Sequence, residues 1–286
     1  MAVEGEPHSP EPREREGGLR FAFESVKSER HPERNEDEHL ELPEQQTFAV
    51  FDGMSIPRGG EIAARIAKQS LEHRFGRLPT GASLEQNRQL LDQILREAHE
   101  VVVDYAQANK QFEGFGSTAV VARLHRSAEG KYSALVGNVG DSRAYVLRRG
   151  GLEQVTIDDS FIFSGLPEQE QRALQKKFSE VTAIDQLSPR ELELWNRRNT
   201  ITNSLVNNGT PRIYEIALEP SDTLLLASDA ISDNLTDTEI ASILMAAGSP
   251  ENAAHALIVV ARRRSREKGL RAKPDDMTAI VVEIPS

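Results

Sequence analysis

The sequence predicts a layered α+β domain built on antiparallel sheets, and two observations carry this prediction. First, several strand candidates follow one another with only short turns between them, at Gly140-Asp141 and at Arg149-Gly150-Gly151, which is typical of antiparallel strands. Second, two long stretches carry apolar residues three and four positions apart, the spacing of an amphipathic helix. Because such a helix buries one face against a sheet, the elements should form layers.

Each element has its own signal in the sequence. Period-two alternation and short apolar runs predict strands at residues 19–26, 47–51, 117–124, 132–139, 142–148, 212–217, 223–227 and 277–284. Helical spacing predicts helices over about residues 60–74, 84–109, 189–198, 237–247 and 250–267. Three of these helices start at a capping box, namely Ser83 with Gln86, Ser188 with Glu191 and Thr236 with Glu239.

The chain of 286 residues is long enough to bury a core without covalent staples. Residues 1–18 carry almost no apolar side chains, so they cannot offset the entropy of ordering, and we predict a disordered tail. No internal repeat and no Pro/Gly/Ser-rich linker follows. Residues 19–286 are therefore expected to form a single domain.

Composition excludes several classes of function. The chain has 45 Asp+Glu against 34 Lys+Arg, a net charge of −11, which disfavours nucleic acid and anionic membrane as partners. It has no cysteine, which excludes cysteine nucleophiles, Cys-based zinc sites and iron–sulfur clusters and predicts a reducing, cytoplasmic location. No apolar run approaches the roughly 18–20 residues of a membrane helix.

Carboxylates stand at the ends of three predicted buried strands. Asp52-Gly53 ends one apolar run, Asp229 ends a second, and Asp275-Asp276 opens a third. A carboxylate at the end of a buried strand needs a counter-charge. No arginine or histidine in the sequence is placed to match each of these carboxylates. Oxygen ligands without Cys or paired His favour Mg²⁺ or Mn²⁺ over zinc. Two interpretations stay open at this point, a divalent-cation site and ordinary turn aspartates.

Seven motifs, in this order and spacing, resemble the metal-dependent protein phosphatases, the PPM or type 2C serine/threonine family, in its bacterial form. The resemblance covers about residues 20–284. The motifs are Asn35-Glu36-Asp37, Phe48-Ala49-Val50-Phe51-Asp52-Gly53-Met54 with Gly59-Gly60-Glu61, Gly116-Ser117-Thr118-Ala119, Asn138-Val139-Gly140-Asp141-Ser142-Arg143-Ala144-Tyr145, Leu225-Leu226-Ala227-Ser228-Asp229, Ser232-Asp233-Asn234-Leu235 and Lys273-Pro274-Asp275-Asp276-Met277-Thr278.

The resemblance implies a four-layer α-β-β-α sandwich, two antiparallel sheets flanked by helices, with a two-metal centre at one end. It implies three catalytic aspartates, Asp52, Asp229 and Asp276, of which Asp52 bridges the two metals and the other two bind one of them. The Gly53 carbonyl binds the other metal, and Glu36 and Asp37 act mainly through water. A third metal, found in some members, would be held by Asp141, Asp229 and Asp233.

The implied activity is Mg²⁺- or Mn²⁺-dependent hydrolysis of phosphoserine and phosphothreonine by a metal-bridging hydroxide. The partner is then a phosphorylated protein, and the chain is expected to act as a monomer. Residues 159–199 fall where the family has a variable flap beside the active site, and their length and capped helices predict an ordered flap.

Three positions depart from the family pattern. Met54 stands where many eukaryotic members have a histidine, Ala230 replaces a glycine, and Pro32 replaces the usual phosphate-binding arginine, a role that Arg30 or Arg34 could take over. These departures favour an alternative interpretation, a weakly active or inactive relative that binds and regulates a partner protein. The retained aspartates favour an active enzyme.

Overall fold

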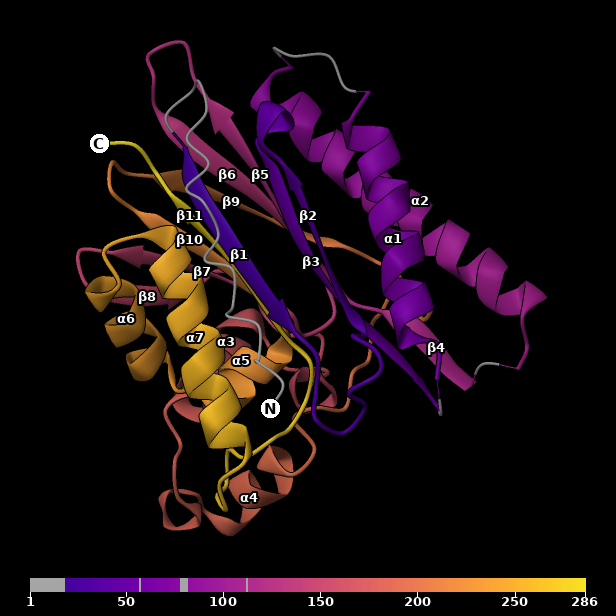
Figure 1. The fold of residues 1–286 in the computed structure, drawn as a ribbon, viewed down its shortest axis with the longest axis vertical. Coiled ribbons are helices and arrows are strands. Elements are labelled where there is room, and N and C mark those ends of the chain that lie inside the picture. The colour runs from indigo at the N-terminus through magenta and orange to yellow at the C-terminus, as the bar shows by residue number, and fades with distance from the viewer. Residues whose placement is uncertain (1–18, 57, 78–81, 112) are drawn as a thin grey trace, which may run out of the picture.

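The computed structural model describes residues 19–56, 58–77, 82–111 and 113–286. The predicted tail, residues 1–18, lies outside them. Two antiparallel sheets form the centre of the molecule (Figure 1). The first has the strand order β1 (Arg20–Val26), β11 (Met277–Glu283), β10 (Thr223–Ala227), β7 (Arg143–Arg148) and β8 (Gly151–Gln154). The second has the order β2 (Asp37–Leu42), β3 (Thr47–Ile56), β5 (Ala119–Arg126), β6 (Tyr132–Val139) and β9 (Arg212–Leu218), with β4 (Glu113–Ser117) paired to the end of β3.

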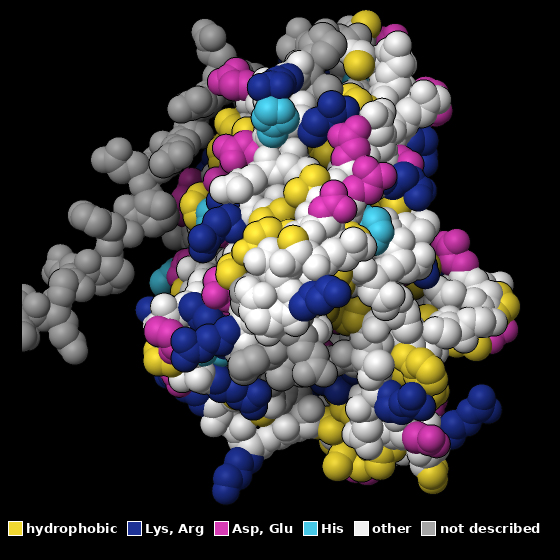
Figure 2. Space-filling view, turned by 90° about the vertical axis from the view of Figure 1, so that its right-hand side faces the viewer, with side chains coloured by type: hydrophobic (Ala, Val, Ile, Leu, Met, Phe, Trp, Pro, Cys, Tyr) yellow, Lys and Arg dark blue, Asp and Glu magenta, His cyan; other side chains and the backbone are white. Residues whose placement is uncertain are grey.

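Helices cover the outer face of each sheet (Figure 1). On the second sheet lie α1 (Gly60–Phe75) and α2 (Leu84–Ala108), and on the first lie α5 (Asp229–Asn234), α6 (Asp237–Ala246) and α7 (Pro250–Ser265). The predicted four-layer sandwich is therefore confirmed. On the face that α2 occupies, acidic and basic side chains are interspersed (Figure 2), so the acid excess of the chain is not gathered there.

The alternation of β3 shows why this sequence folds in layers. Phe48 and Val50 face the cluster between the two sheets, whereas Ala49 and Phe51 face the cluster under α1 and α2. All four side chains are completely buried. A strand that is buried on both faces reads as a continuous apolar run, which is the signal that predicted it.

Residues 159–199 fold into two short 3₁₀ turns and the helices α3 (Glu168–Ser179) and α4 (Pro189–Trp195). They have a small core of their own, in which Phe178 meets the edge of Trp195 with ring centroids 5.3 Å apart. The capping box predicted at Ser188 is present, since its hydroxyl accepts a hydrogen bond from the Glu191 N–H. Among the described residues, no helix has both the length and the apolar character needed to cross a membrane.

Candidate metal centre

The pairing of β2 with β3 brings the first two carboxylate motifs together. Asp37 and Asp52 are register partners in this antiparallel pair, and the Gly53 N–H donates to the Glu36 carbonyl at 3.0 Å. The Asp52 N–H donates to Thr118 Oγ1 at 3.0 Å, which fixes the backbone of Asp52 from its other side. Residues distant in sequence thus form one rigid edge at the end of the second sheet.

The first sheet supplies the remaining carboxylates from its own strand ends. Asp229 is the first residue of α5 and is separated from β10 by Ser228 alone, and Asp141 lies in the turn between β6 and β7. Asp275 lies in the loop that leads into β11. The charges of Asp37, Asp229 and Asp275 each act on Asp52, so the two sheets meet at a single acidic centre.

This centre is electrostatically unfavourable without a cation. Desolvation, reinforced by the charges of Asp37 and Asp229, raises the pKa of Asp52 well above its usual range. Burial raises the pKa of Asp37 and of Asp141 in the same way, with neighbouring aspartates adding to the effect. Several carboxylates held this close cannot all ionise unless positive charge lies among them.

Three carboxylate oxygens show where that positive charge belongs. Asp37 Oδ2, Asp141 Oδ1 and Asp229 Oδ1 are buried and have no hydrogen-bond partner among the described residues. Buried polar atoms are nearly always bonded, and unpartnered carboxylate oxygens are the ligands that hard divalent cations take. The donor set fits Mg²⁺ or Mn²⁺.

Gly53 and Gly60 let two backbone segments meet beside this centre. A Cβ atom at Gly53 would lie 2.1 Å from the Gly60 carbonyl oxygen and 2.5 Å from that of Glu36, and a Cβ atom at Gly60 would lie 2.6 Å from the Gly53 carbonyl oxygen. Only glycine fits at either position. The Gly53 carbonyl, predicted as a ligand, therefore lies in a cradle that a side chain would fill.

Gly53→Ala should accordingly destabilise the protein by more than the roughly 1–3 kcal/mol of ordinary overpacking, because the clashing atoms are backbone and cannot rotate away. Thermal unfolding in EDTA measures this effect, and Mn²⁺ titration measures the accompanying loss of affinity. Gly269→Ala is the matched control, since no atom lies within 4 Å of its added Cβ. Equal melting temperatures for the two variants would contradict the close backbone packing at Gly53.

The structure separates Asp275 from Asp276, which the sequence could not. Both oxygens of Asp276 accept backbone N–H groups, Oδ1 from Ser28 at 2.5 Å and Oδ2 from Glu36 at 2.6 Å. Its carboxylate lies beside His31 and Glu36, and its charge raises the pKa of Asp37, whereas the charge of Asp275 raises the pKa of both Asp37 and Asp52. Asp276 therefore positions the Glu36 backbone, and we propose that the ligand role predicted for Asp276 falls to Asp275.

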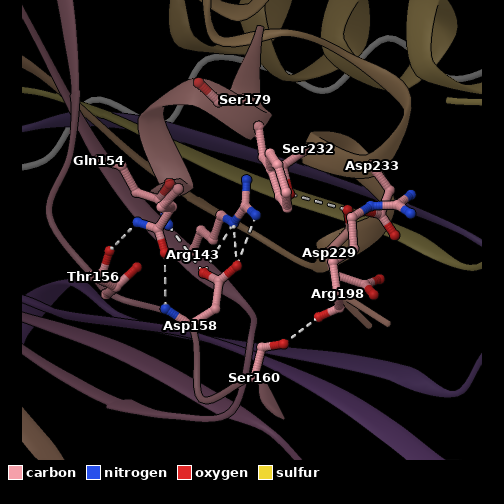
Figure 3. Close-up of polar contacts among 12 residues, drawn as sticks. Arg143, Gln154, Thr156, Asp158, Ser160, Ser179, Arg198, Asp229, Ser232 and Asp233 are labelled. Atoms are coloured by element: carbon pink, nitrogen blue, oxygen red, sulfur yellow. Dashed lines mark hydrogen bonds and ion pairs between the residues drawn. The ribbon is translucent and has the colours of Figure 1, made fainter. Parts of the chain in front are cut away.

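The three aspartates predicted to hold a third metal do lie together, but with protein cations among them. Lys273 Nζ contacts Asp229 Oδ2 and lies 3.0 Å from Asp233 Oδ2, and Arg198 Nε lies 3.5 Å from Asp233 Oδ1 (Figure 3). Although burial acts to raise it, the charges of Lys273 and Arg198 lower the pKa of Asp233 to about 2. No residue pattern indicated either cation: Lys273 lies within one of the seven motifs but is not an expected ligand, and Arg198 has no local signal.

The two arginines predicted to bind phosphate differ in their surroundings. Arg34 forms ion pairs with two carboxylates, with Nη1 2.7 Å from Glu33 and Nε 2.9 Å from Glu36. Arg30 instead lines a cavity of about 330 Å³ that Asp275 also lines. Of the two, Arg30 is the arginine that shares a cavity with Asp275.

Arg271 joins the flap to the centre. Its buried guanidinium donates to the carbonyls of Phe178 and Val181 in the flap, both at 2.6 Å, and to those of Ser232 and Leu235 at 2.7 and 3.0 Å. Because a buried carbonyl that loses its donor is costly, this one side chain fixes the flap against α5.

Arg271→Met should lower the free energy of unfolding by about 2 kcal/mol or more, since several buried carbonyls lose their donor together. Limited proteolysis at the flap should become faster than in the wild type. Arg190→Met, at an exposed position of α4, is the control and should leave the cleavage rate unchanged. An unchanged rate in the Arg271 variant would mean that the flap is held by its own core.

Comparison with known proteins agrees with this geometry. The family model for protein phosphatase 2C matches residues 27–258. The serine/threonine phosphatase stp of Listeria welshimeri is 25% identical over 241 residues, 84% of each chain. The structure of Stp1 from Staphylococcus aureus matches with a TM-score of 0.75 and 27% identity, covering 99% of this chain and 100% of that one. The PstP catalytic domain, solved in complex with two manganese ions, matches with a TM-score of 0.70 and 25% identity, covering 94% and 99%. The chain belongs to the protein phosphatase 2C family of metal-dependent serine/threonine phosphatases.

Proposed function

We propose that this chain hydrolyses phosphoserine and phosphothreonine in proteins at the centre formed by Asp52, Asp37, Asp229, Asp275 and the Gly53 carbonyl. The observation that carries the proposal is the set of buried carboxylate oxygens without partners. Two Mg²⁺ or Mn²⁺ ions, when bound there, would supply the charge that activates water and neutralises phosphoryl oxygens. An inactive regulator of a partner protein is not favoured, since the relatives are phosphatases.

The protein's own residues prepare this reaction by holding the carboxylates in place. The Asp52 backbone is held through Thr118, whose Oγ1 lies 2.7 Å from Ser142 Oγ, and the Glu36 backbone is held by Asp276. This preorganisation means that the ligands need not move when phosphate arrives. Asp37 reaches the centre as the register partner of Asp52 in the β2–β3 pair, and Glu36 precedes it in the chain.

Arg30 is our candidate for the residue that binds the substrate phosphate. Its side chain and Asp275 line the same cavity, whereas Arg34 is already paired with Glu33 and Glu36. A guanidinium matches the geometry of phosphate oxygens. Met54, in the position where some relatives have a histidine, has no titratable group, so the leaving alkoxide takes its proton from solvent or from another side chain.

Phosphate release from p-nitrophenyl phosphate and from a phosphothreonine peptide, with Mn²⁺ and then with EDTA, tests the proposal. We expect turnover of both substrates with Mn²⁺, none in EDTA, and a raised KM for the peptide in Arg30→Met but not in the exposed control Arg190→Met. Turnover that survives EDTA would overturn the metal-dependent mechanism. Turnover of the small substrate without the peptide would overturn the assignment of protein substrates.

We further propose that the protein acts as a cytoplasmic monomer. The absence of cysteine and the net charge of −11 support this location and disfavour nucleic acid and anionic membrane as partners. Cell fractionation and size-exclusion chromatography with light scattering test the two parts. Recovery in the membrane fraction, or a dimer mass, would contradict them.

A further inference from the structure

Lys273 places an ammonium group among the carboxylates of the centre. Its Nζ contacts Asp229 Oδ2, lies 3.0 Å from Asp233 Oδ2 and lies 3.5 Å from Asp275 Oδ2. The lysine side chain is 26% exposed, and that of Asp233 is 7% exposed, so water screens this contact much less than it screens a surface pair.

The backbone of Lys273 is held at this position from both sides. Its N–H donates to Asn234 Oδ1 at 3.1 Å, and Asn234 Nδ2 donates back to its carbonyl oxygen at 2.8 Å. Asn234 is fully buried in α5. Two residues earlier, Arg271 donates to the carbonyls of Ser232 and Leu235, and Pro274 follows with its restricted φ. The lysine is therefore part of the architecture that also carries Asp229 and Asp233.

Protein side chains face both oxygens of Asp233. Oδ2 accepts from Lys273 and from Asn199 Nδ2, and Oδ1 faces Arg198 Nε at 3.5 Å. A divalent cation bound to Asp233 would have to displace these donors and would be repelled by both positive side chains. Within the described residues the buried unpartnered oxygens belong to Asp37, Asp141 and Asp229, so Asp233 is the one member of the predicted third-metal set without such an oxygen.

We propose that the Lys273 ammonium group takes the place of a third metal ion, so that this chain binds two divalent cations and not three. The lysine supplies positive charge at Asp229 and Asp233 covalently, whatever the free metal concentration. The inference rests on the proposed metal centre but not on its substrate. Counting bound ions therefore tests it independently of any phosphatase assay.

The stoichiometry of Mn²⁺ binding, measured from the EPR signal of free Mn²⁺ during titration up to millimolar concentrations, is the direct test. We expect two ions per chain for the wild type and for Lys273→Arg, and three for Lys273→Met, because the neutral side chain frees Asp229 Oδ2 and removes the ammonium charge beside Asp233. Lys131→Met, exposed in the turn between β5 and β6, should bind two. Three ions in the wild type, or two in Lys273→Met, would overturn the proposal.

Thermal unfolding gives a second readout that needs no catalysis. Lys273→Met should melt below the wild type in EDTA, because its aspartates lose their internal cation. Saturating Mn²⁺ should then raise its melting temperature by more than that of the wild type, since it binds one ion more. Equal Mn²⁺-induced shifts would contradict the proposal. If Lys273→Met fails to fold, Lys273→Gln takes its place in both experiments. If the peptide is not hydrolysed but the wild type binds two Mn²⁺ ions and Lys273→Met binds three, only the substrate assignment is overturned.

Discussion

Asp52→Asn should lower kcat/KM by on the order of 10³-fold or more while making the metal-free protein more stable. The loss exceeds the roughly 10–100-fold of an altered outer-shell residue, because Asp52 would be a direct ligand of the metal ions. The metal-free protein becomes more stable because Asp52 lies among Asp37, Asp229 and Asp275. A neutral amide at this position removes the repulsion between the carboxylates. Initial rates with Mn²⁺ and thermal unfolding in EDTA measure the two effects.

Asp104→Asn, at an exposed position of α2, is the control for this substitution and should change neither quantity. The Mn²⁺-induced rise in melting temperature should be smaller in Asp52→Asn than in either the control or the wild type. An Asp52 variant that melts lower than the wild type in EDTA, or that keeps wild-type activity, would show that this carboxylate is structural.

The stabilisation by Asp52→Asn should grow with pH. In the unfolded chain the carboxyl titrates near its ordinary pKa of 3.8, and in the metal-free folded protein desolvation and neighbouring aspartates raise the pKa well above that value. The folded state therefore binds the proton more tightly, so the stability contributed by this group is full below the unfolded pKa and is lost as pH rises through the folded pKa. The melting-temperature difference between Asp52→Asn and the wild type in EDTA should widen from pH 5 to pH 8. A difference that narrows would contradict the raised pKa.

The strands that were predicted well are those in which a run of apolar residues indicates burial. The run that includes Phe48 and Val50 predicted the first half of β3, and the capping boxes at Ser83, Ser188 and Thr236 each mark a real helix start. Strand β2 (Asp37–Leu42) was missed because its sequence is rich in acids and histidine and it lies at a sheet edge, half-exposed. Helix α5 was missed because it has only six residues and starts at Asp229 itself.

Sequence motifs indicated which carboxylates carry the chemistry but not which oxygen atoms face the centre. Asp275 and Asp276 are adjacent and chemically identical, and only the backbone donors of Ser28 and Glu36 distinguish them. The position of Lys273 among the aspartates could not be predicted for the same reason. Its charge matters because α5 and the loop before β11 meet, an interaction between elements far apart in sequence that no local pattern contains.

Arg143→Met should destabilise the fold by about 3–5 kcal/mol, because it leaves the buried carboxylate of Asp158 without its partner. Arg143 donates to Asp158 through Nε at 3.0 Å and Nη2 at 2.7 Å (Figure 3). It also donates to the Tyr145 hydroxyl at 3.1 Å. The two paired side chains are 15% and 8% exposed. Denaturant unfolding in EDTA measures the change without interference from bound metal.

The double variant Arg143→Met with Asp158→Leu separates the value of the ion pair from the cost of orphaning one partner. Because replacing both members of a buried pair by apolar groups is often nearly neutral, most of the lost stability should return. Arg96→Met removes an exposed pair with Asp92 at 2.7 Å and should leave the free energy of unfolding almost unchanged. A double variant no more stable than Arg143→Met would place the loss in the hydrogen bonds that Arg143 and Asp158 make to Tyr145 and Gln154, and the pair itself would then contribute little.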